Sequence, residues 1–194
     1  MRPLSVCLLT ALTATVLAAC GGGKSDEDQI TEVIQKTATT TSVENCTRLA
    51  TQRFVEQTTF DTGAAAIKSC EQPTPGSNAK SVRVSSVQVN GDHATAAVAV
   101  SGGSFDGQTL KISLLKQDGQ WKVDHIDAFL HFDQQKLAAA LEKGLSSGNN
   151  AVTPSQASCV ASGFANASPD AVKTVILSGQ ASALVPVLRK CGLG

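Results

Sequence analysis

Residues 81–125 read SVRVSSVQVNGDHATAAVAVSGGSFDGQTLKISLLKQDGQWKVDH, and this stretch decides the fold. Its valines, leucines and isoleucines alternate with polar or small residues, which is the pattern of strands that bury one face. Asn90-Gly91 and Asp118-Gly119 separate the alternating runs and are strong signals for tight hairpin turns. The alternation slips by one residue at Ser85-Ser86, which predicts a β-bulge. The stretch therefore predicts four antiparallel strands in a meander, the last of them around residues 121–125.

Apolar residues recur at helical spacing before these strands. One helix is expected from Asp26, a second after the polar run at residues 39–42, and a short third after Asp61. The residues expected to share one face of the second helix are Val43, Cys46, Leu49, Ala50 and Phe54. Helices followed by a meander of strands predict an α+β fold with an antiparallel sheet.

The spacing is helical again beyond Phe132. Thr153-Pro154 and Ser168-Pro169 each place a capping residue before a proline, which is typical of a helix start. Pro186 is expected to kink the last helix or to restart it. The fold is therefore expected to end in a small helical segment that spans residues 133–194.

The N-terminus has the features of an export signal. Arg2 precedes an uncharged apolar run at residues 4–19 that ends in small residues. The run is shorter than the roughly 20 residues that span a bilayer comfortably, which favours a cleaved signal over a permanent anchor. Residues 1–19 are therefore interpreted as a signal peptide and residues 20–25 as a flexible tether.

The end of this signal is specific. Leu17, Ala18, Ala19 and Cys20 form a motif that resembles the lipobox of bacterial lipoproteins. The resemblance implies that the thiol of Cys20 carries a diacylglyceryl group and that the chain is cut before it. The alternative is an ordinary secreted protein that has a cysteine at its cleavage site. The expected location is the extracytoplasmic face of the cell membrane, with lipid on Cys20 as the anchor.

The charge balance excludes one class of partner. The chain has 16 basic and 16 acidic side chains, and loss of the signal peptide removes one basic residue, Arg2. A slightly acidic mature chain has no basic excess to neutralise phosphates, so no nucleic-acid partner is expected.

Four cysteines remain after Cys7 leaves with the signal peptide and Cys20 takes lipid. An even number in an exported chain predicts disulfides, and four cysteines can pair in three ways. We favour the pairs Cys46–Cys70 and Cys159–Cys191, because each would close one compact helical segment. Zinc is the alternative, but no Cys-x-x-Cys spacing occurs and no histidine lies near these cysteines in sequence. No metal site is expected.

The helical part contains Cys46-x-x-Leu49, Phe54 and Cys70, and the last hairpin is Asp118–Val123. Together with the order of elements, these residues resemble the NTF2-like (cystatin-like α+β) superfamily and its small exported lipoproteins. The resemblance covers about residues 26–130, and residues 26–132 are assigned to this domain. It implies a curved four-stranded sheet wrapped around helices, with a cone-shaped cavity. Members include ketosteroid isomerases, dehydratases and non-catalytic binding modules, so the fold does not choose between these functions.

The best candidates for chemistry are His125, Asp127 and His131. In a continuous strand His125 and Asp127 would share a face with Trp121 and Val123, and could act as a base and its orienter or as metal ligands. The alternative, which we favour, is that the strand ends there and that these groups lie in water at the rim of the sheet. The chain also contains no tyrosine, a common oxyanion donor in isomerase sites.

These observations favour a non-catalytic envelope module that binds a small apolar ligand or another envelope protein. No catalytic residue and no cofactor are assigned. The runner-up is an isomerase-like or dehydratase-like enzyme. The side chains at the floor of the cavity separate the two hypotheses, because acid–base catalysis needs a titratable group there.

The lipid anchor gives the first testable prediction. Cys20→Ser should abolish acylation and leave unprocessed precursor, because the thiol is the acceptor of the lipid. Mass spectrometry of the N-terminal peptide and membrane fractionation measure both effects. An unchanged mature N-terminus together with full membrane partition would contradict the prediction.

Overall fold

A computed structural model describes residues 23–72, 75–147, 152–180, 182 and 185–193. The signal peptide 1–19 and Leu17, Ala18, Ala19 and Cys20 lie outside the described residues, so the anchor stays a prediction. Within the described ranges, no helix is both long enough and apolar enough to cross a membrane.

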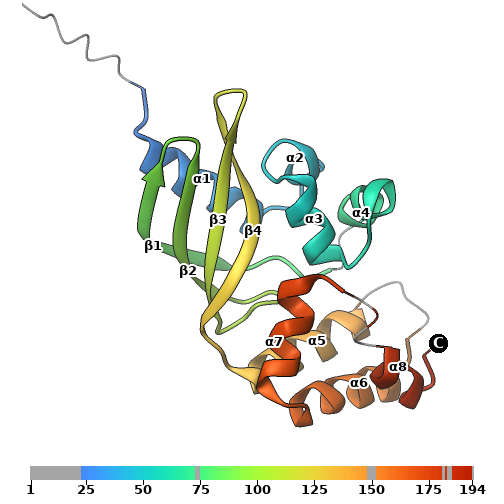
Figure 1. Ribbon diagram of the computed structural model, residues 1–194. Helices are drawn as coiled ribbons and strands as arrows, with labels where there is room; N and C mark the ends of the chain where they lie inside the picture. Colours follow the sequence, from blue (N-terminus) through green and yellow to red (C-terminus); the bar gives the residue numbers. More distant parts are fainter. Residues whose placement is uncertain (1–22, 73–74, 148–151, 181, 183–184, 194) are drawn as a thin grey trace, which may run out of the picture.

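The elements follow the expected order of helices, sheet and helices (Figure 1). The first group of helices is α1 (Asp26–Thr39), α2 (Glu44–Thr47), α3 (Gln52–Thr59) and α4 (Gly63–Cys70). The strands are β1 (Ser81–Asn90), β2 (His93–Ser101), β3 (Thr109–Gln117) and β4 (Gln120–His131). The second group is α5 (Gln134–Ser147), α6 (Pro154–Asn166), α7 (Pro169–Ser178) and α8 (Val185–Lys190).

The strands form one antiparallel sheet in the order β1-β2-β3-β4, which confirms the predicted meander and the α+β class. Gly91 between β1 and β2 and Asp118-Gly119 between β3 and β4 have positive φ, as tight turns require. The predicted bulge in β1 is also present: the register shifts between Ser85 and Gln88, and Ser86 has a φ of 52°.

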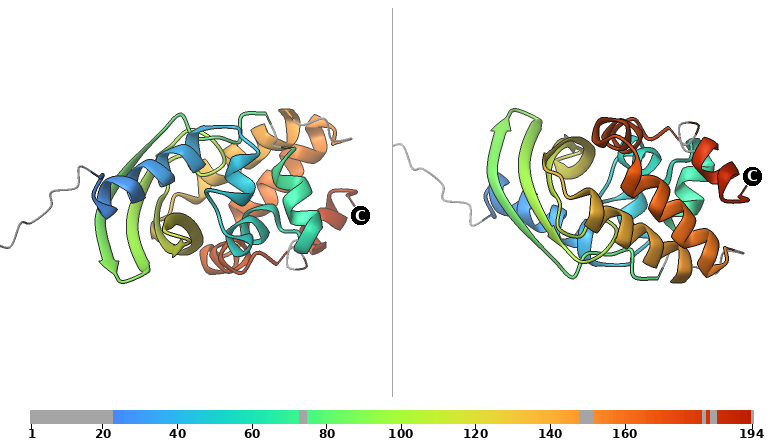
Figure 2. Two further views of the ribbon diagram at one scale, coloured as in Figure 1. Left: turned by 90° about the horizontal axis from the view of Figure 1, so that it is seen from above. Right: turned by 90° about the horizontal axis from the view of Figure 1, so that it is seen from below.

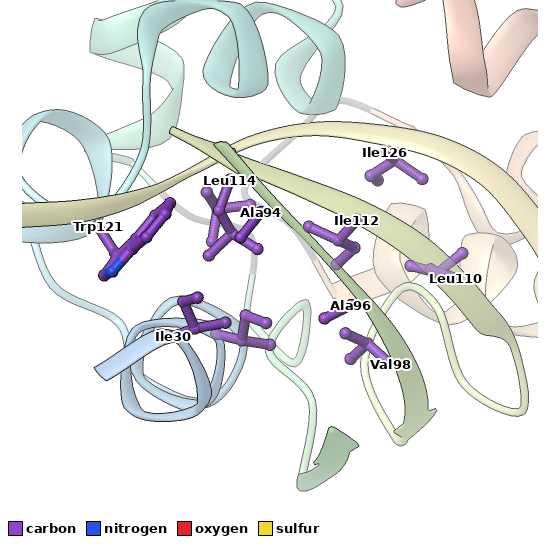
Figure 3. Close-up of a cluster of buried hydrophobic side chains, with 11 residues drawn as sticks. Ile30, Ala94, Ala96, Val98, Leu110, Ile112, Leu114, Trp121 and Ile126 are labelled. Atoms are coloured by element: carbon purple, nitrogen blue, oxygen red, sulfur yellow. The ribbon is translucent and has the colours of Figure 1, made fainter. Parts of the chain in front are cut away.

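One face of the sheet, here called the inner face, packs against α1. Ile30 and Ile34 on α1 are buried, and Ile30 faces the inner side chains of three strands in Figure 3. Those buried side chains are Ala94, Ala96, Val98, Leu110, Ile112, Leu114, Trp121, Val123 and Ile126. In Figure 1 the strands lie in front of α1, and no described helix covers the opposite, outer face of the sheet.

Asp26 fixes the start of α1 on the sheet. Its carboxylate accepts hydrogen bonds from Lys116 Nζ and Trp121 Nε1, both at 2.8 Å. The bond from Lys116, followed by the bond from Trp121, lowers the pKa of Asp26 below its usual value. Because the folded-state pKa is depressed, this contribution to stability is present above the ordinary carboxyl pKa and is lost as the pH falls below it.

The free edge of β4 is covered by residues from the first group of helices. Residues 49–51 form a short parallel bridge with Val123: Thr51 N donates to the Val123 carbonyl (2.9 Å), and Val123 N donates to the Leu49 carbonyl (2.8 Å). Farther along, the side-chain amide of buried Gln57 donates to the Ile126 carbonyl and accepts from Ile126 N. The Gln57 amide therefore takes the place of a neighbouring strand.

This bridge corrects the prediction for the second helix. The expected helix from Val43 through Phe54 is split into α2 and α3, because residues 49–51 are extended against β4. Thr51 then caps α3 by accepting from Phe54 N. Val43 is exposed and does not join the buried face, whereas Cys46 and Ala50 are buried as expected. Helical spacing persists across a break of this kind, so the pattern alone does not reveal it.

Both predicted disulfides are present. Cys46 pairs with Cys70 and Cys159 pairs with Cys191, with Cα–Cα distances of 5.8 and 5.7 Å. The first joins α2 to the end of α4, and the second joins α6 to the end of α8. In the chain-entropy model, each bridge stabilises the fold by about 3–4 kcal/mol.

The second group of helices has its own buried cluster, built around Leu137, Val160, Phe164, Val172 and Ile176. Thr153 and Ser168 cap α6 and α7 as predicted, and α8 restarts with Pro186 in its first turn. Phe105 and Phe129 pack against both this cluster and the sheet cluster. Figure 2 shows these helices gathered beside the sheet and close to the first group of helices.

Gln57 gives a sharp test of this fold. Gln57→Met keeps the length of the side chain but leaves buried Ile126 N–H without its partner, so unfolding should require about 2–3 kcal/mol less free energy. Gln35→Met, at an exposed position of α1, is the matched control and should change stability by less than about 0.5 kcal/mol. Urea unfolding measures both. Equal effects in the two variants would show that the amide does not cap the strand.

Candidate functional site

A cavity of about 750 Å³ lies between the inner face of the sheet and both groups of helices. Val98, Leu110, Ile112, Val123 and Ile126 line it from the sheet. The second group of helices supplies Leu137, Ala140, Leu141, Gly144, Leu145, Phe164 and Ile176. Most of this surface is apolar, so the cavity can hold an apolar molecule of the size that protein pockets usually bind.

The ionisable side chains lie elsewhere. Among the described residues that line the cavity there is no aspartate, glutamate, histidine, lysine or arginine, and Cys70 is held in a disulfide. A buried charge without a partner costs several kcal/mol or more, so this lining disfavours a charged ligand. It also supplies no titratable group for proton transfer to a molecule bound inside.

Neutral polar side chains also line the cavity, and they come from several segments. Thr37, Thr41, Asn45 and Asn78 lie near the C-terminal end of α1 or after it, and the others are Thr40, Ser42, Gln57, Thr58, Thr59, Ser69, Gln72, Ser77 and Ser104. Asn45 Nδ2 donates to the Thr40 carbonyl (2.6 Å) and, at 3.4 Å, to the Thr37 carbonyl, and Asn78 donates to the Thr41 hydroxyl. The lining therefore combines apolar side chains with neutral polar groups.

The sequence did not predict this polar lining. The helix break predicted at residues 39–42 is present, and Thr40, Thr41 and Ser42 in this break also line the cavity. The N-cap expected from this run is absent, because Val43 precedes α2 without a side-chain cap. Thr37 carried a signal, because it follows Ile34 by three residues and precedes Ala38 on the buried stripe of α1. The wall formed by α5 had no signal, because its position depends on packing between segments far apart in sequence.

The structure brings His125 and Asp127 together, but on the outer face of the sheet. His125 Nδ1 and Asp127 Oδ1 lie 3.1 Å apart, and Ser113 Oγ donates to the same carboxylate oxygen at 3.1 Å. The expectation that His125 and Asp127 share a face with Trp121 and Val123 is wrong. The register of β3 against β4 shifts between Ser113 and Leu114, which adds one residue to β4 and reverses the facing of the residues after Asp124.

The predicted position of His125 and Asp127 at the end of a strand is also wrong. We expected β4 to end near His125, whereas it continues to His131 through further register shifts. His125 and Asp127 are therefore partly exposed groups in the middle of a strand, with side-chain exposures of 18% and 31%. His131 is exposed at the end of β4, opposite Thr109, and is not part of this pair.

The order of these groups differs from that of a nucleophilic triad. In such a triad the imidazole stands between carboxylate and hydroxyl, so that it can take the hydroxyl proton. Here the Asp127 carboxylate stands between Ser113 and His125, and the serine hydroxyl is bonded to the carboxylate. Asp124 is also engaged elsewhere, by Thr51 and Arg53. Within the described ranges, no three His, Cys, Asp or Glu side chains are grouped to hold a metal ion.

Three carboxyl groups have lowered pKa values, and each shift has a structural cause. Hydrogen bonds from Lys24 and then Lys36 lower the pKa of Glu32 to about 2, and bonds from Gln52 and Gly63 N lower that of Glu56. Asp26 is bonded to Lys116 and Trp121 on the sheet. None of these three carboxyl groups lines the cavity. Surface ion pairs and caps account for the shifts, so they do not mark a catalytic site.

The outer-face pair should contribute little to stability. His125→Ala and Asp127→Ala are each expected to lower the free energy of unfolding by less than about 1 kcal/mol, because the pair is partly solvated. Urea unfolding measures the change, with Gln57→Met as a variant that should be clearly destabilised. A loss for His125→Ala as large as that for Gln57→Met would show that the pair has a role beyond a surface contact.

Comparison with protein families, curated proteins and solved structures finds no match to this chain. The likeness to the NTF2-like superfamily therefore rests on the residues quoted from the sequence, and the function must be argued from the cavity.

Proposed function

We propose that this chain is an exported lipoprotein, anchored through Cys20, whose NTF2-like cone binds a small uncharged, mainly apolar ligand without chemically changing it. The cavity is the observation that carries the proposal. Its volume of about 750 Å³ lies within the range of roughly 300–1,000 Å³ that is usual for small-molecule sites. Its described lining has no ionisable side chain, which supports a neutral ligand.

The arrangement of the sheet supports the NTF2-like part of the proposal. Helices precede a four-stranded antiparallel meander, α1 packs on its inner face, and the cavity opens over the same face. The second group of helices then forms a wall of the cavity with α5. This wall adds aliphatic surface from Leu137, Leu141 and Leu145, so the C-terminal segment would take part in ligand binding.

Isomerase-like or dehydratase-like chemistry has less support. A general base must lie within hydrogen-bond reach of the reacting atom, and the described cavity lining offers hydroxyl and amide groups instead. The His125–Asp127 pair lies on the other face of the sheet. Binding without catalysis is therefore the function that the geometry favours.

A protein partner also has less support than a small ligand. The large apolar side chains that are exposed among the described residues are Val43, Val89, Leu130 and Val185. They belong to four different segments of the chain. Exposed apolar residues that are scattered singly are ordinary on protein surfaces.

The anchor gives the proposal a physical context. Lipid on Cys20 and the short tether at residues 20–25 would hold the cavity close to the membrane, where apolar molecules concentrate. A near-neutral chain would approach that surface without strong attraction or repulsion. The protein would then capture or hold a molecule that enters or leaves the bilayer.

Gly144 provides the test. It lines the cavity from α5, and a Cβ at this position would meet no atom within 4 Å. Gly144→Leu should therefore place a side chain in the cavity without a clash, and should weaken binding of the neutral probe phenylnaphthylamine by about tenfold or more. Ser146→Leu, at an exposed position of the same helix, is the matched control and should bind like the wild type.

The full chain should be used in lipid nanodiscs, so that probe dissolved in the bilayer contributes equally to each variant. Trp121 is the sole tryptophan, and energy transfer from it to the probe reports on probe bound near the core. Equal binding by wild type and Gly144→Leu would reject the cavity as the binding site.

A further inference from the structure

The phenylalanines of this chain are concentrated around the cavity. Of the six phenylalanines in the sequence, four line it, although the lining takes up only a small part of the chain. Phe54 and Phe60 come from α3 and its end, Phe105 from the connection between β2 and β3, and Phe164 from α6. Three parts of the fold therefore bring aromatic rings to the same space.

These four rings have no aromatic partner among the described residues. The one pair of contacting rings in the described ranges is Phe129–Phe132, which meet edge to face with centroids 4.9 Å apart and lie outside the cavity lining. Aromatic rings gain stabilisation beyond area burial when they pair offset-stacked or edge to face. The two phenylalanines outside the lining use this stabilisation, and the four in the lining leave it available to a bound ring.

Phe60 is the ring that packing within the protein explains least. Phe54, Phe105 and Phe164 belong to the buried clusters of the described residues, whereas Phe60 belongs to none of them. Phe60 is half-buried and lines the cavity, so part of its surface is open to a bound molecule. The core therefore does not account for a phenylalanine at this position.

The backbone at this position also disfavours phenylalanine. Phe60 ends α3 with φ 60° and ψ 17°, in the left-handed region. Gly179 ends α7 with φ 64° and ψ 19°, and glycine adopts this conformation without a steric cost. A bulky residue there is strained, and strained residues of this kind gather at ligand sites. Phe60 is therefore held at the cavity against the preference of its backbone.

The rest of the lining restricts the charge of the ring that would fit. No ionisable side chain lies among the described lining residues, so an aromatic acid or amine would be buried without a counter-charge. A saturated hydrocarbon would replace water over the same apolar surface, but it has no π system with which the phenylalanines could pair. A neutral aromatic ring gains from both effects.

We propose that the ligand is a neutral molecule with a planar aromatic ring system, and that the Phe60 side chain pairs with this ring system. This inference rests on the proposed function. It adds the chemical class of the ligand and makes Phe60 the residue that selects it.

The experiment measures displacement of phenylnaphthylamine from the full chain in nanodiscs by naphthalene and by decahydronaphthalene. These two competitors share one carbon skeleton and differ in aromaticity. Probe fluorescence is excited directly, at a wavelength that naphthalene does not absorb, and the free concentration of each competitor is measured by gas chromatography. Naphthalene should displace the probe at a free concentration lower by about threefold or more, because it can pair with the rings. Burial of apolar area alone predicts no such preference, because the saturated compound has at least as much apolar surface.

Phe60→Leu removes the ring, keeps an apolar side chain and should weaken naphthalene binding by about threefold. Its affinity for decahydronaphthalene should stay within about twofold of wild type, which also shows that the variant is folded. Phe60→Tyr keeps a ring and should retain the preference for naphthalene. Phe132→Leu makes the same change at another half-buried phenylalanine, outside the lining, and is the matched control that should behave like wild type.

The outcomes separate the two proposals. If the wild type does not bind the probe in a way that Gly144→Leu weakens, the proposed function fails. If the probe binds as expected but decahydronaphthalene competes as well as naphthalene, the cavity does not select an aromatic ligand and this inference fails alone. An unchanged preference in Phe60→Leu, or an equal loss of both affinities, would overturn the role of Phe60.

Discussion

The rest of the structure depends on how the free edge of β4 is satisfied. An edge strand presents backbone N–H and carbonyl groups that need partners when they are buried. In this protein the partners are the extended residues 49–51 and the side-chain amide of Gln57. These contacts break the second helical segment into α2 and α3, and they position α3 beside the sheet.

The same amide links the sheet to the C-terminal helices. Gln57 Nε2 also donates to the Leu177 carbonyl at 2.9 Å, which ties α3 and β4 to α7. Two further glutamines act in a similar way: Gln108 bonds the backbone of Asp133 before α5, and Gln134 on α5 bonds carbonyls at the end of α6. The Gln57 bond links the two groups of helices, and the bonds of Gln108 and Gln134 fix the start of α5, which forms one wall of the cavity.

Register shifts in β4 decide which side chains face the cavity. A continuous strand would place His125 on the side of Trp121, whereas the shift at Asp124 brings Ile126 inward and turns His125 outward. One extra residue therefore separates the candidate acid–base groups from the interior. It leaves a lining of hydrocarbon, hydroxyl and amide groups, which suits the binding of a neutral molecule better than proton transfer.

The sequence by itself determined the class of fold, the four-stranded meander, the bulge in β1 and the caps of α6 and α7, because periodicity and turn chemistry act locally. The even number of cysteines predicted disulfides but allowed three pairings, and the favoured pairing, in which each bridge closes one compact helical segment, is the one present. The sequence also predicted the export signal and the lipid on Cys20. Only the tertiary structure decided the break at residues 49–51, the outward turn of His125 and the cavity with its uncharged lining. These features depend on hydrogen bonds and packing between residues far apart in the chain, which a local pattern cannot encode.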